Sequence, residues 1–241
     1  MGRSVVLAGA ERCRGCRLPP RWCVCGVLPR VVTAPAVDVL MHRREQWRPS
    51  STGALITRVV EGARLHVHRP DPRSRAEVRL PEGLLRQGHE CWILHPRGEL
   101  PRASAMRGDG AGPLQVILLD GSWREAAEMA RLVGDSLVGG DGMPAAPVRL
   151  VKVPCPGEGR FWVRDQREEG HVSTAEALLA LLELVGDGTT ARRLRLHFEL
   201  HVWATLRARG KRQRAGEFLA SSPLLEEIPA VIAALERAAS G

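Results

Sequence analysis

The sequence predicts an α/β fold in which a mostly parallel β-sheet is flanked by helices. Short apolar runs with β-branched residues alternate along the chain with longer segments of helical periodicity, which is the pattern of strand–helix–strand units. Flexible connectors rich in glycine separate several of these segments. With 241 residues and 44% hydrophobic content, the chain can bury one sizeable core.

Five segments have the composition of strands. One apolar run ends at His42, and another ends directly before Asp120. The predicted strands are 35–42, 64–68, 90–96, 114–119 and 148–154.

Helical patterns follow most of these strands. The first predicted helix starts near Ser50 or Ser51 and stops at Gly62, and the second spans about 123–133 and stops at Gly134. The third begins with the segment STAEALLALLELVG, and the fourth, 189–209, combines an apolar face with many arginines. The tail from residue 217 onward predicts a closing helix.

The chain is strongly basic. Its formal net charge is +8, and only two of the 35 basic residues, Lys152 and Lys211, are lysines. A basic protein attracts polyanions, and arginine offers a planar fork for phosphate and a face that stacks on bases. A GC-rich genome would produce the same arginine bias without any such role.

Hydropathy argues against a membrane protein. The longest apolar candidate, ALLALLELV, contains Glu183 and is shorter than the roughly 18 residues of a membrane span. The first residues are too weakly apolar for a secretory signal. We therefore expect a cytoplasmic protein with no membrane association and no obligate protein partner.

Cysteine spacing predicts a metal site. Four of the six cysteines lie in CRGCRLPPRWCVC, as Cys13, Cys16, Cys23 and Cys25, with the spacing C-x2-C-x6-C-x-C. Two close pairs across a proline-rich turn are typical of four thiolates around a tetrahedral zinc in a reducing compartment. The alternative is a set of unligated thiols. A structural zinc would fold this loop, because metal binding contributes on the order of 10 kcal/mol where little core is available.

The stretch VILLDGSWREAAEM, residues 116–129, places Asp120 between a predicted strand and a predicted helix. Ligands of parallel α/β sheets bind beyond the carboxyl ends of the strands, which makes this acid a candidate site residue. A turn or cap residue is the alternative, because Ser122 and Glu125 have the spacing of a capping box. Ser173 and Glu176 form a second pair of this kind, and His42 is compatible with an ordinary strand end.

Four motifs stand in order along the chain: CRGCRLPPRWCVC, MHRREQWRPSSTGAL, LLDGSW and RFWVRDQREEGHVSTAEAL. Together they resemble the DTW-domain family of tRNA-uridine aminocarboxypropyltransferases, which is related to the rRNA aminocarboxypropyltransferases and the SPOUT methyltransferases. The resemblance extends from about Cys13 to about Leu206. The chain departs from the family at Gly121 and Ser122, where threonine is usual, and at Ser51, where asparagine is frequent.

The resemblance implies an activity and a fold. Members of the family transfer the 3-amino-3-carboxypropyl group of S-adenosylmethionine to N3 of a uridine in tRNA and release 5′-methylthioadenosine. Relatives share a SPOUT-like α/β sheet with a knotted cofactor loop, so we expect that fold here, with a small N-terminal zinc knuckle of four cysteines. The expected organisation is a knuckle over 11–30, a DTW catalytic domain over 31–210 and a helical tail over 211–241.

The resemblance also implies roles for individual residues. Asp120 would be the base for N3 or an acceptor that positions the reactants, and Trp123 would stack on adenine or the target base unless it belongs to the core. S-adenosylmethionine would be bound by Thr52, Gly53, Leu119, Gly121, Ser122, Ser173, Thr174 and Glu176. tRNA would contact His42, Arg43, Arg44, Arg48, Arg192, Arg193 and Arg195, although a solvated helix face explains these arginines equally well.

Two rival functions remain. A methyltransferase that uses the same cofactor would release S-adenosylhomocysteine, and a zinc-bearing RNA-binding module without catalysis would have no use for Asp120. A serine hydrolase acting through Ser122 is disfavoured, because LLDGSWRE lacks the G-x-S-x-G turn.

Overall fold

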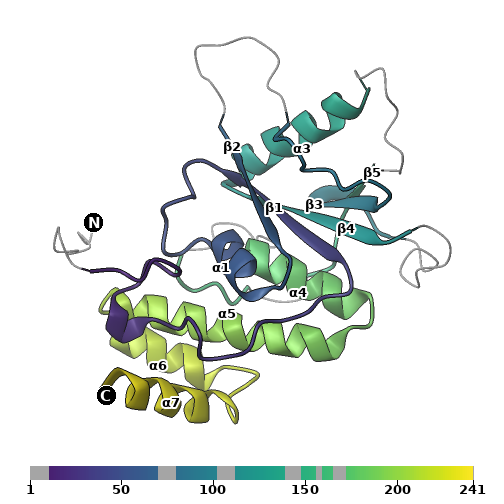
Figure 1. Ribbon diagram of the computed structural model, residues 1–241. Coiled ribbons are helices and arrows are strands. Elements are labelled where there is room, and N and C mark those ends of the chain that lie inside the picture. Colours follow the sequence, from purple (N-terminus) through teal and green to yellow (C-terminus); the bar gives the residue numbers. More distant parts are fainter. Residues whose placement is uncertain are drawn as a thin grey trace.

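The computed structural model describes residues 11–69, 80–101, 112–138, 148–155, 159–164 and 172–240, whose elements are shown in Figure 1. The strands are β1 (Ala36–His42), β2 (Arg64–His68), β3 (Glu90–Glu99), β4 (Leu114–Asp120) and β5 (Val148–Val151). The helices are the 3-10 turn η1 (Pro20–Trp22), α1 (Thr52–Val59), α3 (Trp123–Val138), α4 (Thr174–Leu184), α5 (Gly188–Ala208), α6 (Arg212–Ala220) and α7 (Ile228–Ser240).

The five strands form one parallel sheet in the order β2-β1-β4-β3-β5. The central strand β4 pairs with β1 up to Met41 opposite Asp120, and it pairs with β3 on its other side. Because the strands run in the same direction, their carboxyl ends meet at one edge, where ligands of such sheets bind. The predicted α/β class with a mostly parallel sheet is confirmed, while the knot and the domain boundaries stay predictions.

Alternation along β4 distributes its side chains between two cores. Val116 and Leu118 belong to the larger core, to which α1, α4 and α5 contribute, whereas Ile117 belongs to the smaller core, to which α3 contributes. In Figure 1, α3 lies on one side of the sheet and α1 and α4 on the other. Asp120 is in phase with Val116 and Leu118, and its side chain therefore points toward α1 and α4.

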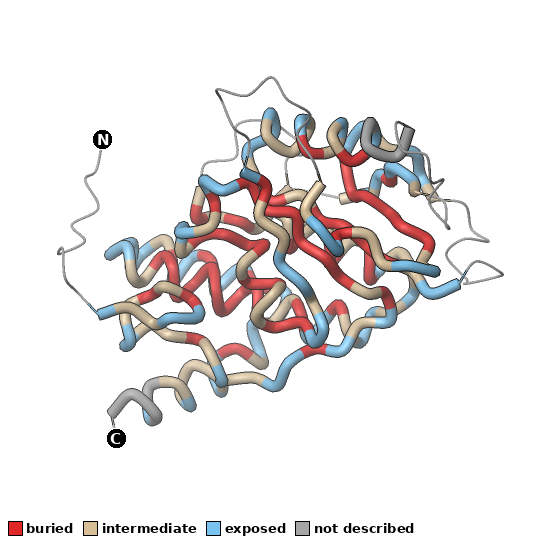
Figure 2. Tube along the Cα trace, turned by 45° about the horizontal axis from the view of Figure 1, so that its top comes forward, coloured by how far each residue is buried: buried red, intermediate tan, exposed pale blue. Residues whose placement is uncertain are grey.

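The larger core extends beyond the sheet in both directions along the chain. It includes Leu18 and Val24 from the cysteine-rich segment and Phe218 and Ile228 from α6 and α7. Figure 2 shows that buried residues run through the sheet and the adjoining helices, and that exposed residues alternate with them on the outer surfaces. In the described part of the chain, none of the helices is both long and apolar enough to cross a membrane.

Two helix boundaries differ from those the sequence predicts. The helix expected to stop at Gly134 continues to Val138, because Met129 and Val133 anchor it in the smaller core. A glycine inside a helix costs only about 0.5–1 kcal/mol relative to alanine, which such packing offsets. The single closing helix expected after residue 217 is instead the end of α6 followed by the separate helix α7.

A buried ion pair joins the segment before α4 to α5 and α6. The Arg160 guanidinium donates two hydrogen bonds to Glu199, from Nε to Oε1 (2.6 Å) and from Nη2 to Oε2 (2.7 Å). The remaining donors reach the carbonyl oxygens of Phe218 and Ser221, both at 3.0 Å. Glu199 is fully buried, and the two hydrogen bonds from the Arg160 guanidinium stabilise its negative charge there.

We expect Glu199→Gln to lower the free energy of unfolding by about 3–5 kcal/mol, because it leaves a guanidinium without its counter-charge. The matched control is Glu183→Gln, which removes the exposed partner of Arg195 and should cost no more than about 1 kcal/mol. Urea unfolding followed by circular dichroism measures both changes. Equal effects of the two variants would contradict a special role for the buried pair.

Candidate active site and cysteine cluster

A pocket of about 1070 Å³ opens at the carboxyl edge of the sheet. It is bordered by the ends of β3, β4 and β5 and by the first turns of α3 and α4. Of the residues predicted to bind the cofactor, the lining contains Thr52, Leu119, Gly121, Ser122, Ser173 and Thr174, together with Asp120 and Trp123. The structure thus brings together most of the predicted catalytic and cofactor-binding residues.

Asp120 lies at the centre of a set of hydrogen-bond donors. Ser51 Oγ donates to Oδ2 at 2.8 Å, and Thr174 Oγ1 donates to Oδ1 at 2.7 Å. The backbone N–H of Gly53 also donates to Oδ1, at 3.3 Å. The carboxylate therefore joins the end of β4 to the first turns of α1 and α4.

Gly53 allows this close approach of helix and carboxylate. A Cβ atom at position 53 would lie 2.6 Å from Cγ of Asp120, closer than two such atoms can come. Ser51 caps the same helix by accepting a hydrogen bond from Ala54 N at 3.0 Å. A single hydroxyl thus serves both as the N-cap of α1 and as a donor to Asp120.

Burial raises the pKa of Asp120 above the ordinary value of 3.8, and the hydrogen bonds from Thr174 and Ser51 oppose this shift. The buried carboxylate of Glu45 acts with burial, whereas the guanidinium of Arg164 acts against it. The side chain is only 5% exposed. Asp120 can therefore exchange a proton at a higher pH than an exposed aspartate does.

The start of α4 has the geometry of a capping box. Ser173 Oγ accepts from Glu176 N, and the Glu176 carboxylate accepts from Ser173 N at 2.7 Å. The other carboxylate oxygen of Glu176 accepts from Arg160 N at 2.5 Å. The predicted cap is confirmed, and both oxygens of Glu176 have protein partners.

The start of α3 contains the second predicted capping box. The backbone N–H and the hydroxyl of Ser122 both donate to Glu125 Oε2 at 2.8 Å. Glu125 Oε1 lies 3.0 Å from Nδ1 of His42 and 3.4 Å from a guanidinium nitrogen of Arg44. His42, predicted to contact tRNA, is thus buried against α3. Trp123 lies on the pocket wall with 38% of its surface exposed.

The arginines predicted to contact RNA fall into two groups. Arg43, Arg44 and Arg48 are exposed on the loop between β1 and α1, next to the pocket. Arg192, Arg193 and Arg195 lie near the start of α5, where Thr190 donates to the carbonyl oxygen of Val32 at 3.5 Å. Because Val32 precedes β1, this second group lies toward the amino edge of the sheet, opposite the pocket.

Four basic residues on the pocket wall were not singled out by the sequence motifs: Arg97, Arg124, Lys152 and Arg164. Arg164 donates to the buried Glu45 carboxylate at 2.6 Å, and this carboxylate also accepts from Arg48 at 2.5 Å. The motif RFWVRD contains Arg164 and could have identified it. Arg124 directly follows Trp123 in the stretch VILLDGSWREAAEM, so its place beside the pocket could also have been read from the sequence. Arg97 and Lys152 lie outside the motifs, and only the tertiary structure brings these two to the pocket.

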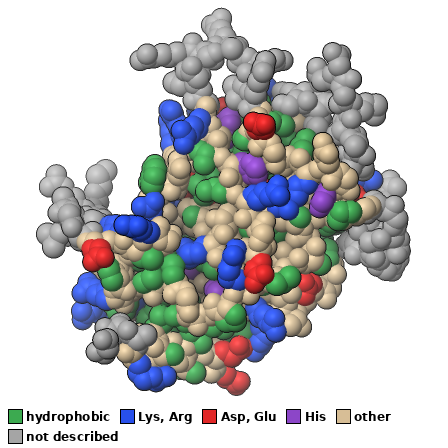
Figure 3. All heavy atoms as spheres, viewed as in Figure 1, with side chains coloured by type: hydrophobic (Ala, Val, Ile, Leu, Met, Phe, Trp, Pro, Cys, Tyr) green, Lys and Arg blue, Asp and Glu red, His purple; other side chains and the backbone are tan. Residues whose placement is uncertain are grey.

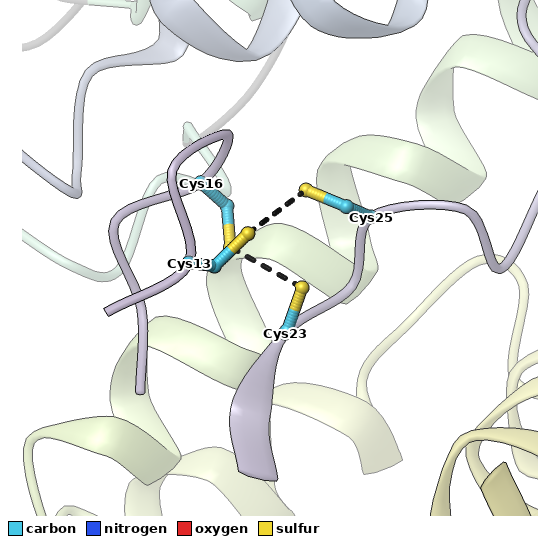
Figure 4. Close-up of side chains that lie close together, drawn as sticks. All are labelled: Cys13, Cys16, Cys23 and Cys25. Atoms are coloured by element: carbon cyan, nitrogen blue, oxygen red, sulfur yellow. Dashed lines mark hydrogen bonds between the residues drawn. The ribbon is translucent and has the colours of Figure 1, made fainter. Parts of the chain in front are cut away.

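The four cysteines of the N-terminal motif converge beside α5 (Figure 4). Their sulfur atoms all lie within 4.8 Å of one another, and the pairs Cys13–Cys25 and Cys16–Cys23 are each 3.8 Å apart. Thiolates held at about 2.3 Å from a tetrahedral zinc would be separated by about 3.8 Å. The residues present therefore fit a metal site with four thiolate ligands.

The cluster has one thiol that ionises easily. A hydrogen bond from Cys25 lowers the pKa of Cys16 to about 5 against the effect of burial, and the nearby Arg58 guanidinium acts in the same direction. Burial raises the pKa of Cys23 to about 11. Four close thiols of this kind gain from a bound cation, because the cation compensates the charges that deprotonation would leave together.

Comparison with known proteins places these features in a family. The chain matches the DTW domain over residues 10–206. It is 26% identical over 184 residues to "tRNA-uridine aminocarboxypropyltransferase 2" from Drosophila melanogaster, an alignment that covers 72% of this chain and 67% of that protein. No solved structure gives a significant match. Because the match to the DTW domain includes the cysteine cluster, the pocket and α4, the chain belongs to the DTW-domain family.

Proposed function

We propose that the protein transfers the 3-amino-3-carboxypropyl group of S-adenosylmethionine to N3 of a uridine in tRNA and releases 5′-methylthioadenosine. The observation that carries this proposal is the buried carboxylate of Asp120 on the wall of a basic pocket at the carboxyl edge of the sheet. Membership of the DTW-domain family and the name of the Drosophila melanogaster relative support the same activity.

The pocket fits a donor of this size and charge. Its volume of about 1070 Å³ lies just above the usual range of about 300–1,000 Å³ for small-molecule sites, so a donor of this size fits with room for the target base. The start of α4 and the basic groups of Arg97, Arg124 and Lys152 suit the carboxylate of the donor. The predicted contacts of the donor are Thr52, Gly53, Leu119, Gly121, Ser122, Ser173, Thr174 and Glu176. Two of them would act indirectly: Gly53 through its hydrogen bond to Asp120, and Glu176 through the cap of α4. When bound, S-adenosylmethionine supplies a carbon activated by its sulfonium.

The reaction replaces the N3–H bond of uridine by a bond to carbon. Uridine N3 loses its proton and bonds to the methylene carbon beside the sulfonium, while the carbon–sulfur bond breaks and its electron pair goes to sulfur. Alignment of the reacting atoms can contribute about 7–11 kcal/mol to lowering the barrier. The protein therefore has to orient the two reactants and to accept the N3 proton.

Asp120 is suited to both tasks. A carboxylate has about four acceptor positions, and Ser51, Gly53 and Thr174 occupy three of them. The fourth would accept the N3–H group of the substrate and, in the base mechanism, its proton. The raised pKa strengthens Asp120 as a base, and the three donors fix its orientation.

The target uridine has to be unpaired, because N3 lies on its Watson–Crick edge. A base in a tRNA loop meets this requirement. Trp123, on the pocket wall, supplies a flat surface for the uracil or the adenine ring.

The activity can be tested by incubating the purified protein with S-adenosylmethionine and tRNA from a strain that lacks this gene. We expect mass spectrometry to detect a uridine that carries the aminocarboxypropyl group, together with methylthioadenosine. Formation of S-adenosylhomocysteine would instead identify a methyltransferase. Binding of RNA without either product would favour the non-catalytic alternative.

Replacement of Asp120 by asparagine should lower the rate of transfer by about 10²–10⁴-fold, because the amide cannot take up the N3 proton. In the wild type, the rate should rise with pH through the raised pKa of Asp120, since only the deprotonated form is a base. The variant should lack this rise. Glu183→Gln, which makes the same chemical change on the exposed surface, is the control. A variant with normal turnover and an unchanged pH profile would exclude the base role.

We further propose that the cysteine cluster binds one structural zinc ion. Metal analysis of the purified protein should give one zinc per chain, and Cys25→Ser should lower this content and the midpoint of thermal unfolding. Cys155→Ser is the matched control, because Cys155 lies outside the cluster. A chelator should make the segment 11–30 sensitive to protease, because metal binding contributes on the order of 10 kcal/mol to such sites. Full zinc content in Cys25→Ser would contradict the assignment.

A further inference from the structure

Trp47 is a large aromatic side chain on the surface beside the pocket. It belongs to the loop between β1 and α1, and 66% of its surface is exposed. Ser50, three residues further on, lies on the pocket wall. Three residues span at most about 11 Å, so the backbone of Trp47 lies within that distance of a residue of the pocket wall.

The loop that carries Trp47 is firmly held. Glu45 is 2% exposed and accepts hydrogen bonds from Arg48 (2.5 Å) and from Arg164 (2.6 Å) on the pocket wall. Backbone hydrogen bonds from Arg48 N to Glu45 O and from Ser51 N to Arg48 O, both 3.0 Å long, complete two turns around it. These hydrogen bonds hold the loop in a conformation that leaves Trp47 exposed.

The cysteine-rich segment provides a partner for the indole. The guanidinium carbon of Arg17 lies 4.9 Å from the centroid of the Trp47 ring, within the range of a cation–π contact. Arg17 has a φ of 62°, a left-handed conformation that is uncommon for residues other than glycine. Hydrogen bonds from Arg17 N to Cys13 O and from Cys13 N to Leu18 O, both 2.9 Å long, hold it there. The knuckle thus positions a guanidinium over the ring.

The surroundings of the ring are basic. The exposed residues Arg14, Arg43, Arg44 and Arg48 belong to the two segments that meet here. The acids of the same segments are the exposed Glu11 and the buried Glu45, which accepts hydrogen bonds from Arg48 and Arg164. Arg44 also lies 3.4 Å from Glu125 of α3, so Arg14 and Arg43 carry most of the charge that is left for a ligand. Figure 3 shows Lys and Arg side chains beside apolar ones at several places on the molecular face that it presents. An exposed ring flanked by guanidinium groups has the composition of a platform for single-stranded nucleic acid.

We propose that Trp47 and Arg17 form a stacking platform for an unpaired base that neighbours the target uridine, and that the adjacent arginines contact its phosphates. This inference rests on the proposed function for the identity of the RNA. Arg17 covers one face of the indole, and the exposure of the ring leaves surface on which a base can stack. An apolar protein partner fits this surface less well, because it would have to desolvate several guanidinium groups around a single ring.

The inference is tested by binding of the full chain to labelled RNA. Trp47→Ala should weaken binding of tRNA and of a single-stranded oligouridylate by about 5–150-fold, which corresponds to the loss of one stacked base. Binding of a blunt RNA duplex should not change, because its bases are already stacked. Trp47→Phe should retain part of the affinity, and Leu225→Ala, at an exposed apolar residue between α6 and α7, should retain all of it.

Salt dependence separates stacking from phosphate contacts. Trp47→Ala should leave the slope of log affinity against log salt unchanged, whereas Arg43→Ala should reduce its magnitude by about 0.7–0.9. Arg17→Gly should keep the thermal midpoint, since glycine accepts a positive φ, and should weaken binding of single strands. S-adenosylmethionine binding should be the same in all these variants.

Three results would overturn the platform. One is an unchanged affinity of Trp47→Ala for single strands, and another is an equal loss for single strands and duplex. The third is concentration-dependent self-association of the wild type that Trp47→Ala abolishes, which would make the ring a contact between two copies of the chain. Failure of the transfer reaction is a separate outcome: if single strands still depend on Trp47 without any transfer product, the platform stands and the proposed activity falls.

Discussion

The carboxylate of Asp120 is the point at which three elements of the fold are joined. It ends the central strand, and its hydrogen bonds from Ser51, Gly53 and Thr174 fix the first turns of two helices against that strand. The pocket wall is built from the same turns, so its shape depends on this one side chain. Burial of the acid is tolerated because each contact replaces a lost contact with water. The arrangement that holds the helices thus also prepares an oriented acceptor.

Arginine serves different purposes in different parts of the molecule. Arg86 donates to the fully buried Asp38 at 2.7 Å near the amino edge of the sheet, and Arg160 does the same for Glu199 between the helices. These two arginines neutralise buried acids, whereas others face the pocket. Arg164 does both, because it donates to Glu45 and also lies on the pocket wall. The basic composition alone therefore overstates the charge available to a nucleic acid. The charge available to a nucleic acid depends on those guanidinium groups around the pocket that do not form an ion pair with an acidic side chain.

The sequence predicted features that depend on local pattern. The strand Arg64–His68 and the cap of Ser173 with Glu176 are confirmed, because alternation and S-x-x-E spacing act over a few residues. The order of strands and the partners of Arg160 depend on contacts between distant segments, which no periodicity encodes. The contact between His42 and Glu125 could not be predicted for the same reason, because the two residues are 83 positions apart in the sequence. His42 had therefore been a candidate for contact with RNA. The predicted end of α3 was wrong because Gly134 was read as a helix stop. In the folded protein the packing of Met129 and Val133 offsets the small cost of a glycine inside the helix.

Gly53 shows how tightly the sequence around the pocket is constrained. An added Cβ would lie 2.6 Å from Cγ of Asp120 and 2.8 Å from its Oδ2, so no other amino acid fits while the aspartate remains. Positions 53 and 120 can consequently change only together. A relative with a side chain at the position of Gly53 would have to shorten or displace the acid, which is the proton acceptor in the mechanism we propose. Variation in donor or substrate preference within this architecture therefore has to arise at other positions on the pocket wall.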